Sequence, residues 1–127
     1  MRITEFPVYA VLPCSDVERA KDWYRDRLDA TPSHEDPGGA WFQCANGTTF
    51  VLTPSPNAGT AKNTAASFQV KGIEEVMADL RGRGVEFLEY DQGDFKTTNG
   101  LLAMGPYKAA WFQDSEGNTV EISEVSS

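Results

Sequence analysis

The sequence has no long hydrophobic run. None of its apolar stretches approaches the roughly 20 residues that a membrane-spanning helix requires. Residues 1–7 also lack the basic and apolar stretches of a secretory leader. We therefore expect no membrane contact and a cytoplasmic location.

The sequence is also poor in histidine, cysteine and basic residues. His34 is the only histidine, and the spacing of Cys14 and Cys44 matches no CxxC or zinc pattern. We expect two reduced thiols, although a disulfide between them stays open. There are 11 Lys and Arg against 19 Asp and Glu, so the net charge of −8 would repel a nucleic-acid backbone. We therefore expect no nucleic-acid partner.

What is present fits one globular domain. The chain has 127 residues, 40% of them hydrophobic and 24% charged, with 7 Phe, 4 Tyr and 3 Trp. A chain of this length buries roughly two-thirds of the surface that its unfolded form exposes, so it needs no disulfide or structural metal. We expect a single domain over residues 1–127.

The first half of the chain shows alternating strand and helix signals. Residues 6–12 are rich in β-formers and are followed by Pro13, which predicts a strand that ends there. Ser15 and Glu18 fit an S-x-x-E capping box, and apolar residues at three- and four-residue spacing predict a helix over residues 16–28. Three short strands are then predicted between turn-forming residues, at residues 30–34, 40–44 and 48–53.

The second half repeats this order after a polar connector at residues 53–64. A strand is predicted at residues 65–70 and a helix at residues 73–83, which glycines end. Further strands are predicted at residues 85–90, 100–104, 107–113 and 118–123. The segment at residues 91–99 is expected to be irregular and mobile, and its role stays open.

The two halves can be aligned with each other. Their strand and helix units match at an offset of 56 residues, which pairs Leu12 with Phe68. Their last strands match at an offset of 70 residues, which pairs Val51 with Glu121. An internal repeat of this kind predicts one supersecondary unit used twice.

The residue pattern divides each predicted sheet into two faces. Apolar residues alternate with small or polar ones, so one face lies under the helices and the other carries the small and polar side chains. Tyr9, Trp41 and Trp111 fall on or near the second face. That face therefore is exposed to solvent, buries a second core or a dimer interface, or lines a ligand pocket, and the residues alone leave these alternatives open.

Two segments resemble a known family. Residues 9–28 (YAVLPCSDVERAKDWYRDRL) resemble the opening strand, SD turn and first helix of the glyoxalase/bleomycin-resistance (vicinal-oxygen-chelate) superfamily. Residues 108–122 (KAAWFQDSEGNTVEI) are similar to its closing hairpin, F-x-DPxGNxxEl. The resemblance implies an α+β fold of two βαβββ modules, about residues 5–54 and 64–125, which form a cupped, partly open mixed β-barrel with the helices outside. It also implies a small-molecule site in the cup and a homodimer.

Metal-dependent relatives in this family take one ligand from the opening strand and one from the last strand of each module. Those positions are Tyr9, Val51, Ala65 and Glu121 here, and only Glu121 is a normal metal ligand. Valine and alanine donate no electron pair, and a phenol with a pKa near 10 is a poor ligand at neutral pH. We expect no bound metal and no cofactor.

Three functions remain as hypotheses. The first is a protein that binds a cationic or aromatic small molecule in a metal-free cup. The second is a metal-free lyase or isomerase with Glu121 as general base and Tyr9 as proton donor. The third, which the missing ligands disfavour most, is a divalent-metal glyoxalase-type lyase or dioxygenase. The expected ligand-binding residues are Tyr9, Trp41, Val51, Ala65, Trp111 and Glu121.

Overall fold

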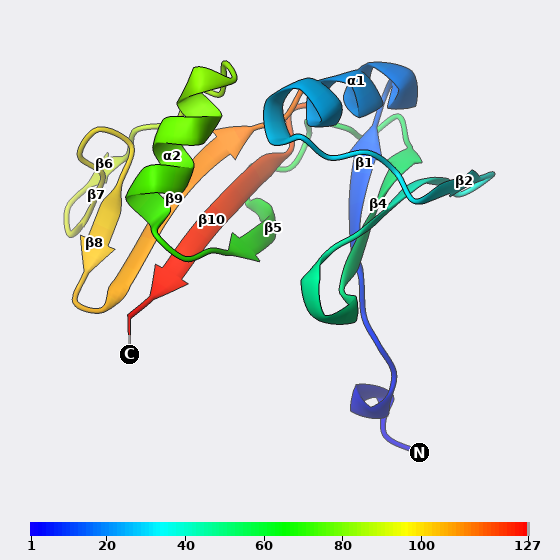
Figure 1. Ribbon diagram of the computed structural model, residues 1–127, viewed down its shortest axis with the longest axis horizontal. Helices are drawn as coiled ribbons and strands as arrows, with labels where there is room; N and C mark the ends of the chain where they lie inside the picture. Colours follow the sequence, from blue (N-terminus) through cyan, green and yellow to red (C-terminus); the bar gives the residue numbers. More distant parts are fainter. Residues whose placement is uncertain (127) are drawn as a thin grey trace.

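Two four-stranded sheets, each with one helix packed on it, form an α+β fold over residues 1–126, which the computed structural model describes (Figure 1). The first sheet has the order β1 (Ala10–Cys14), β4 (Thr49–Pro54), β3 (Gly39–Gln43) and β2 (His34–Asp36). The second sheet has the order β5 (Thr64–Gln69), β10 (Thr119–Val125), β9 (Tyr107–Gln113) and β8 (Leu102–Met104). The remaining elements are η1 (Ile3–Glu5), α1 (Val17–Leu28), η2 (Ala45–Gly47), α2 (Ile73–Gly82), β6 (Asp91–Gln92) and β7 (Phe95–Lys96).

The internal repeat is visible in the sheet topology. In each sheet the first strand lies parallel to the last strand of its module, and the other pairs are antiparallel. Val51 lies opposite Val11 in the first sheet, as Glu121 lies opposite Ser67 in the second. The ladders of the described residues keep β1 and β5 in separate sheets, so the two sheets do not close into the barrel that the resemblance implies.

The first helix begins one residue later than predicted, and its cap is different. Asp16 is the N-cap, and its carboxylate accepts a hydrogen bond from the backbone N–H of Arg19 at 3.0 Å. The Ser15 hydroxyl instead donates to Glu116, a residue of the turn between β9 and β10. The predicted capping box on Ser15 is therefore wrong, because a distant carboxylate takes the hydroxyl that would have capped the helix.

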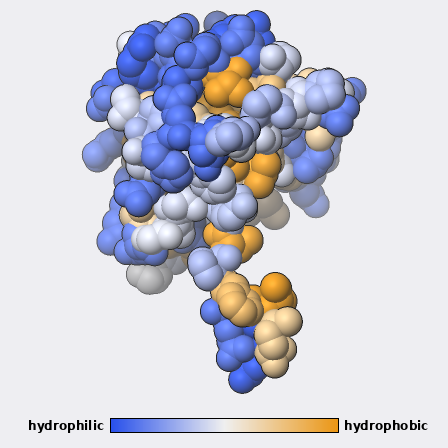
Figure 2. All heavy atoms as spheres, turned by 90° about the vertical axis from the view of Figure 1, so that its right-hand side faces the viewer, coloured by the Kyte–Doolittle hydropathy of each residue, from blue (hydrophilic) through white to orange (hydrophobic). Residues whose placement is uncertain are grey.

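The strand bounds also differ from the predictions, most clearly at β1, at residues 85–90 and at β2, which spans His34–Asp36 rather than residues 30–34. Strand β1 starts at Ala10 and includes Pro13, which an edge strand tolerates because its missing N–H faces no partner. The residues before Ala10 form a segment that extends away from the sheets (Figures 1 and 2). Residues 85–90 form no strand, and only Phe87 makes an isolated bridge, to Phe112 of β9.

The segment at residues 91–99 is more ordered than predicted. It contains the β6–β7 hairpin, and the Phe95 ring lies 5.2 Å from that of Trp111. Thr97 is buried, and its hydroxyl donates to Glu89 at 2.6 Å. The segment is thus packed onto the second sheet by its own apolar and polar contacts.

The core lies between the helices and the sheets. One buried cluster forms around Tyr24 and Phe42 in the first module, and another around Met77 and Phe112 in the second. Trp23 of α1 packs against both clusters, so it connects the two modules. No helix in the described part of the chain has both the length and the apolar character needed to cross a membrane.

Candidate functional site

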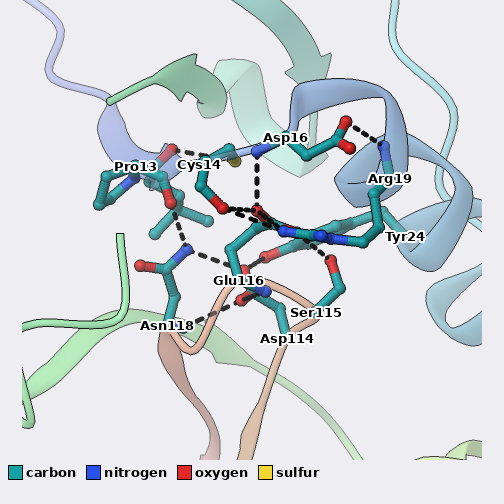
Figure 3. Close-up of polar contacts among 11 residues, drawn as sticks. Pro13, Cys14, Asp16, Arg19, Tyr24, Asp114, Ser115, Glu116 and Asn118 are labelled. Carbon is teal, nitrogen blue, oxygen red and sulfur yellow. Dashed lines mark hydrogen bonds and ion pairs between the residues drawn. The ribbon is translucent and has the colours of Figure 1, made fainter. Parts of the chain in front are cut away.

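A polar network holds the β9–β10 turn against the start of α1 and fixes how the two modules meet (Figure 3). Buried Asp114 accepts hydrogen bonds from the Tyr24 hydroxyl at 2.8 Å and from the Asn118 amide at 3.0 Å. Glu116 accepts from the Arg19 guanidinium at 2.9 Å and from the backbone N–H of Asp16 at 3.0 Å. The bonds to Glu116 join residues about one hundred positions apart in the chain.

Two pKa shifts follow from this network. The Arg19 guanidinium hydrogen-bonded to Glu116 lowers the pKa of that carboxyl from 4.5 to about 2, against the opposing effect of burial. Burial, and then the negative charge of Asp114, raise the pKa of the Tyr24 hydroxyl well above its usual value. Near neutral pH the Glu116 carboxyl therefore stays ionised and the Tyr24 hydroxyl stays protonated. Both groups keep their hydrogen bonds between the modules.

The sheet face opposite the helices, here called the helix-free face, carries a tyrosine–carboxylate pair in the second module. The Tyr107 hydroxyl donates to Glu121 Oε2 at 2.6 Å. Burial, the hydrogen bond and the charge of Glu121 together raise the pKa of Tyr107 to about 12. The structure thus brings Glu121 together with Tyr107, a residue that the sequence analysis did not single out, rather than with Tyr9.

Trp111 lies beside this pair but is covered. It is 6% exposed, and its indole N–H donates to the Thr64 hydroxyl at 3.2 Å. The rings of Tyr90 and Phe95 lie 5.4 Å and 5.2 Å from its ring. Trp111 therefore forms part of a small core on the helix-free face and offers little open surface for stacking.

The first module carries an aromatic group on the same face. The Tyr9 and Trp41 rings meet edge to face at 4.8 Å, and His34 stacks on Trp41 at 5.8 Å. The Trp41 indole N–H donates to Asp36 at 3.0 Å, and this bond lowers the pKa of the Asp36 carboxyl. His34 was missed because its contact with Trp41 depends on the pairing of β2 with β3, which the sequence does not specify.

The other two predicted site residues differ in exposure. Val51 is 3% exposed, whereas Ala65 is exposed and lies where the pairing of β5 with β10 shifts register between Thr64 and Ala66. Among the described residues, no hydrogen bond or ring contact joins the aromatic group of the first module to the Tyr107–Glu121 pair of the second. The predicted residues thus fall into two groups, one on each sheet.

The donor set does not fit a divalent metal ion. The strand neighbours of Val51 and Glu121 are Val11 and Ser67, so Tyr9 and Ala65 lie two residues away from the opposite position. Within residues 1–126, no three His, Cys, Asp or Glu side chains come together as a possible metal site. Glu121 is the only strong ligand at the family's positions, and Tyr107 already occupies one of its oxygens.

The comparisons with known proteins agree with this architecture. The glyoxalase-family protein from Bacillus anthracis has a TM-score of 0.73 at 21% identity, over 99% of this chain and all of that one. The antibiotic-binding protein TnmS3 from Streptomyces sp. CB03234 has a TM-score of 0.68 at 21% identity, with the same coverage. The genomically encoded fosfomycin resistance protein FosX from Listeria monocytogenes has a TM-score of 0.66 at 14% identity, over 95% of this chain and 93% of that one.

These likenesses show a shared fold. None of the curated protein sequences compared with this chain matches it. Residues 7–122, nearly the whole chain, match the family model of the Glyoxalase/Bleomycin resistance protein/Dioxygenase superfamily. The chain therefore belongs to that superfamily.

Proposed function

We propose that this chain binds a small aromatic or cationic organic molecule on its helix-free face, without a metal, and that it does so as a homodimer. The observation that carries the proposal is the aromatic group beside the Asp36 carboxylate, in which Tyr9 and His34 are exposed and Trp41 is half-buried. Aromatic faces next to a carboxylate favour a planar or cationic ligand, and the net charge of −8 acts in the same direction.

The Tyr107–Glu121 pair supplies the polar part of the proposed site. A carboxylate that already accepts one hydrogen bond can accept more from an ammonium or hydroxyl group of a ligand. In this proposal the helix-free faces of both sheets line one cup, with the aromatic group on one wall and Glu121 on the other. A binding role also agrees with the fold shared with TnmS3, an antibiotic-binding protein.

The proposed dimer rests on the N-terminal segment. Met1, Ile3, Phe6 and Val8 are 57–97% exposed, and this segment projects from the body of the chain (Figure 2). Exposed apolar side chains gathered on a projecting segment mark a surface that another molecule covers. A second copy of this chain is the proposed partner.

Calorimetric titration with bleomycin and with ethidium tests the binding proposal. Trp41→Ala removes a stacking surface worth about 1.4 kcal/mol, which corresponds to a tenfold rise in Kd. Glu121→Gln should weaken binding of the cations to a similar degree. The control Glu86→Gln removes an exposed carboxylate outside the helix-free face and should leave Kd unchanged. Absence of binding at millimolar ligand, or equal Kd values for all variants, would contradict the proposal.

A metal-free lyase or isomerase is the second candidate, and the 2.6 Å contact between Tyr107 and Glu121 favours it. In this role Glu121 takes a proton from a carbon beside a carbonyl and Tyr107 donates one. Turnover of a carbonyl substrate by chelator-treated protein, lost in Glu121→Gln and reduced in Tyr107→Phe, would support it. Unchanged turnover in Glu121→Gln would remove the carboxylate from the reaction.

A further inference from the structure

A hollow lies between the two modules on the helix side of the sheets. Phe50 of β4 and Phe68 of β5 meet edge to face at 5.9 Å where the modules touch. Beside this contact is a cavity of about 440 Å³, here called the inter-module cleft, whose walls come from α1, α2 and both sheets. Its apolar lining includes Leu28, Phe42, Phe68, Val76, Leu80 and Ile122.

The cleft is separate from the proposed site on the helix-free face. Side chains alternate along a strand, so Ile122 and Glu121 point to opposite faces of β10, and Phe68 and Ser67 do the same on β5. None of the six site residues predicted from the sequence lines the cleft. A ligand here would therefore bind on the other side of β10 from Glu121.

The size and walls of the cleft suit a compact ring system. Its volume lies within the roughly 300–1,000 Å³ that is typical of small-molecule sites. Leu28, Val70 and Val76 remain half-buried at its surface, so they line the hollow without filling it. A bound apolar molecule would remove this surface from water, which is favourable.

The polar residues that line the cleft favour a cationic ligand over an anionic one. Asp29, Thr31 and Gln43 are exposed and line it, and its lining residues include no lysine or arginine. Asp29 is also the C-cap of α1, where the helix dipole adds partial negative charge. Arg83 reaches Asp29 only at 4.0 Å, with both side chains substantially exposed, so the carboxylate can still attract a cation.

We propose that the inter-module cleft is a second small-molecule site, which takes a compact aromatic amine with its ring among the phenylalanines and its ammonium group near Asp29. This site does not depend on the function proposed for the helix-free face. A ring in the cleft would also bridge the two modules beside the Phe50–Phe68 contact.

The reactivity of the Cys44 thiol can report whether this site is occupied. Cys44 lines the cleft and is half-buried, and burial raises the pKa of its thiol. Cys14 is fully buried, and its thiol donates to the backbone carbonyl of Leu12. A small thiol reagent should therefore modify Cys44 first, and a ligand in the cleft should slow that reaction.

The test measures the rate of Cys44 modification by methyl methanethiosulfonate at pH 8, followed by intact mass. At ten times its Kd, 1-naphthylmethylamine should slow the reaction about tenfold by mass action. The anion 1-naphthoate, of similar size, should protect at least tenfold more weakly because Asp29 repels it. Equal protection by the two probes, or none by the amine, would overturn the proposal.

Two variants and one control locate the effect. Val76→Phe should fill the cleft and abolish protection, whereas Val125→Phe, the same change at an exposed strand end, should not. Asp29→Asn should weaken amine binding without blocking the cleft, and asparagine tolerates the left-handed backbone of Asp29 (φ 54°). Should Val76→Phe fail to fold, Asp29→Asn alone decides. Protection that persists in Val76→Phe, or that is undiminished in Asp29→Asn at the same amine concentration, would overturn the proposal. So would ligand-free Cys44 that becomes less reactive with rising protein concentration, since a second copy would then occupy the cleft.

Discussion

Tyr107 and Glu121 show how a single pair of residues sets the chemistry of the helix-free face. The phenol is held neutral far into the alkaline range because burial, the hydrogen bond and the charge of Glu121 all oppose its ionisation. The Tyr107 hydroxyl donates its one hydrogen to Glu121 at 2.6 Å, so the pair offers a ligand acceptor oxygens on the carboxylate and on the phenol. Together they define the polar end of the proposed site.

Replacing Glu121 by Gln should lower the pKa of Tyr107 from about 12 toward its ordinary value of 10, because the charge is removed and the hydrogen bond is weakened. A folded-state pKa above the unfolded value contributes stability that is complete below pH 10 and lost as the pH rises through 12. Tyrosinate absorbance measured across this range would follow the change, with Tyr107→Phe to assign it. A titration that is the same in Glu121→Gln and the unaltered protein would contradict the pairing.

Residues that belong to a sequence motif could be singled out from the sequence. Residues whose contacts depend on strand register could not. Glu121 was singled out because it lies at a ligand position within the family's last strand. Tyr107 was missed because it reaches Glu121 diagonally across the β9–β10 pair, from a position beyond the residue directly opposite, Trp111. Ser15 was assigned to the wrong partner because the competing carboxylate, Glu116, comes 101 residues later.

At the scale of elements, Glu116 connects the β9–β10 turn to α1 (Figure 3). Its side chain is fully buried, while that of Arg19 is 54% exposed, so solvent screens part of the ion pair. The lowered pKa of Glu116 lies below its unfolded value. The tie therefore stabilises the fold fully above pH 4.5 and is lost as the pH falls toward 2.

Glu116→Gln should lower the free energy of unfolding at pH 7 by about 2 kcal/mol. This value is smaller than the free energy that corresponds to the full pKa shift, because Arg19 is partly solvated. The loss of stability between pH 4.5 and 2 should shrink by a similar amount in this variant. Urea unfolding at several pH values measures both effects. Glu86→Gln, which removes an exposed carboxylate, is the control and should change stability by less than about 0.5 kcal/mol. Parallel pH curves for Glu116→Gln and the unaltered protein would contradict the assignment.

The pairing of β3 with β4 depends on Gly39. Its φ is 133°, and a Cβ atom there would lie 2.0 Å from the carbonyl oxygen of Leu52. Because this oxygen belongs to the backbone and cannot rotate away, Gly39→Ala should lower the free energy of unfolding by at least about 3 kcal/mol. Gly93, with φ 67° and no atom within 4 Å of an added Cβ, is the matched control, and its change to Ala should cost about 1 kcal/mol. Thermal unfolding of the two variants separates steric clash from backbone strain, and equal losses would contradict the clash.

The elements themselves were largely predictable. The spacing of apolar residues indicated α1 and α2 to within one residue, and β9 was predicted with the bounds that the structure shows. The ends of β1 were not, because its pairing with β4 sets where the strand starts and lets it pass through Pro13. The β6–β7 hairpin was missed because Phe95 is ordered by contact with Trp111, which lies in another strand.

In the molecule as a whole, the helix-free faces of the two repeated sheets are equivalent in position but carry different functional groups. Val51 and Glu121 occupy matching positions in the two sheets, yet one is apolar and the other is hydrogen-bonded to Tyr107. The first sheet has an aromatic group beside Asp36, and the second has a tyrosine–carboxylate pair. The sequence repeat predicted the duplicated topology, but the separation of the two sheets depends on packing between modules that no local pattern encodes.

The N-terminal segment gives the last prediction, since it carries the proposed dimer. Deleting residues 1–8 removes Met1, Ile3, Phe6 and Val8, which are all exposed in the single chain, and leaves β1 intact from Ala10. The full chain should sediment as a dimer at micromolar concentration, whereas the shortened chain should be monomeric with nearly the same unfolding temperature at low concentration. The double change Ile3→Ser and Phe6→Ser should weaken the dimer without altering chain length, and Val125→Ser, at an exposed strand end, is the control. A full chain that stays monomeric at high concentration, or a shortened chain that still dimerises with unchanged Kd, would show that this segment does not hold two copies together.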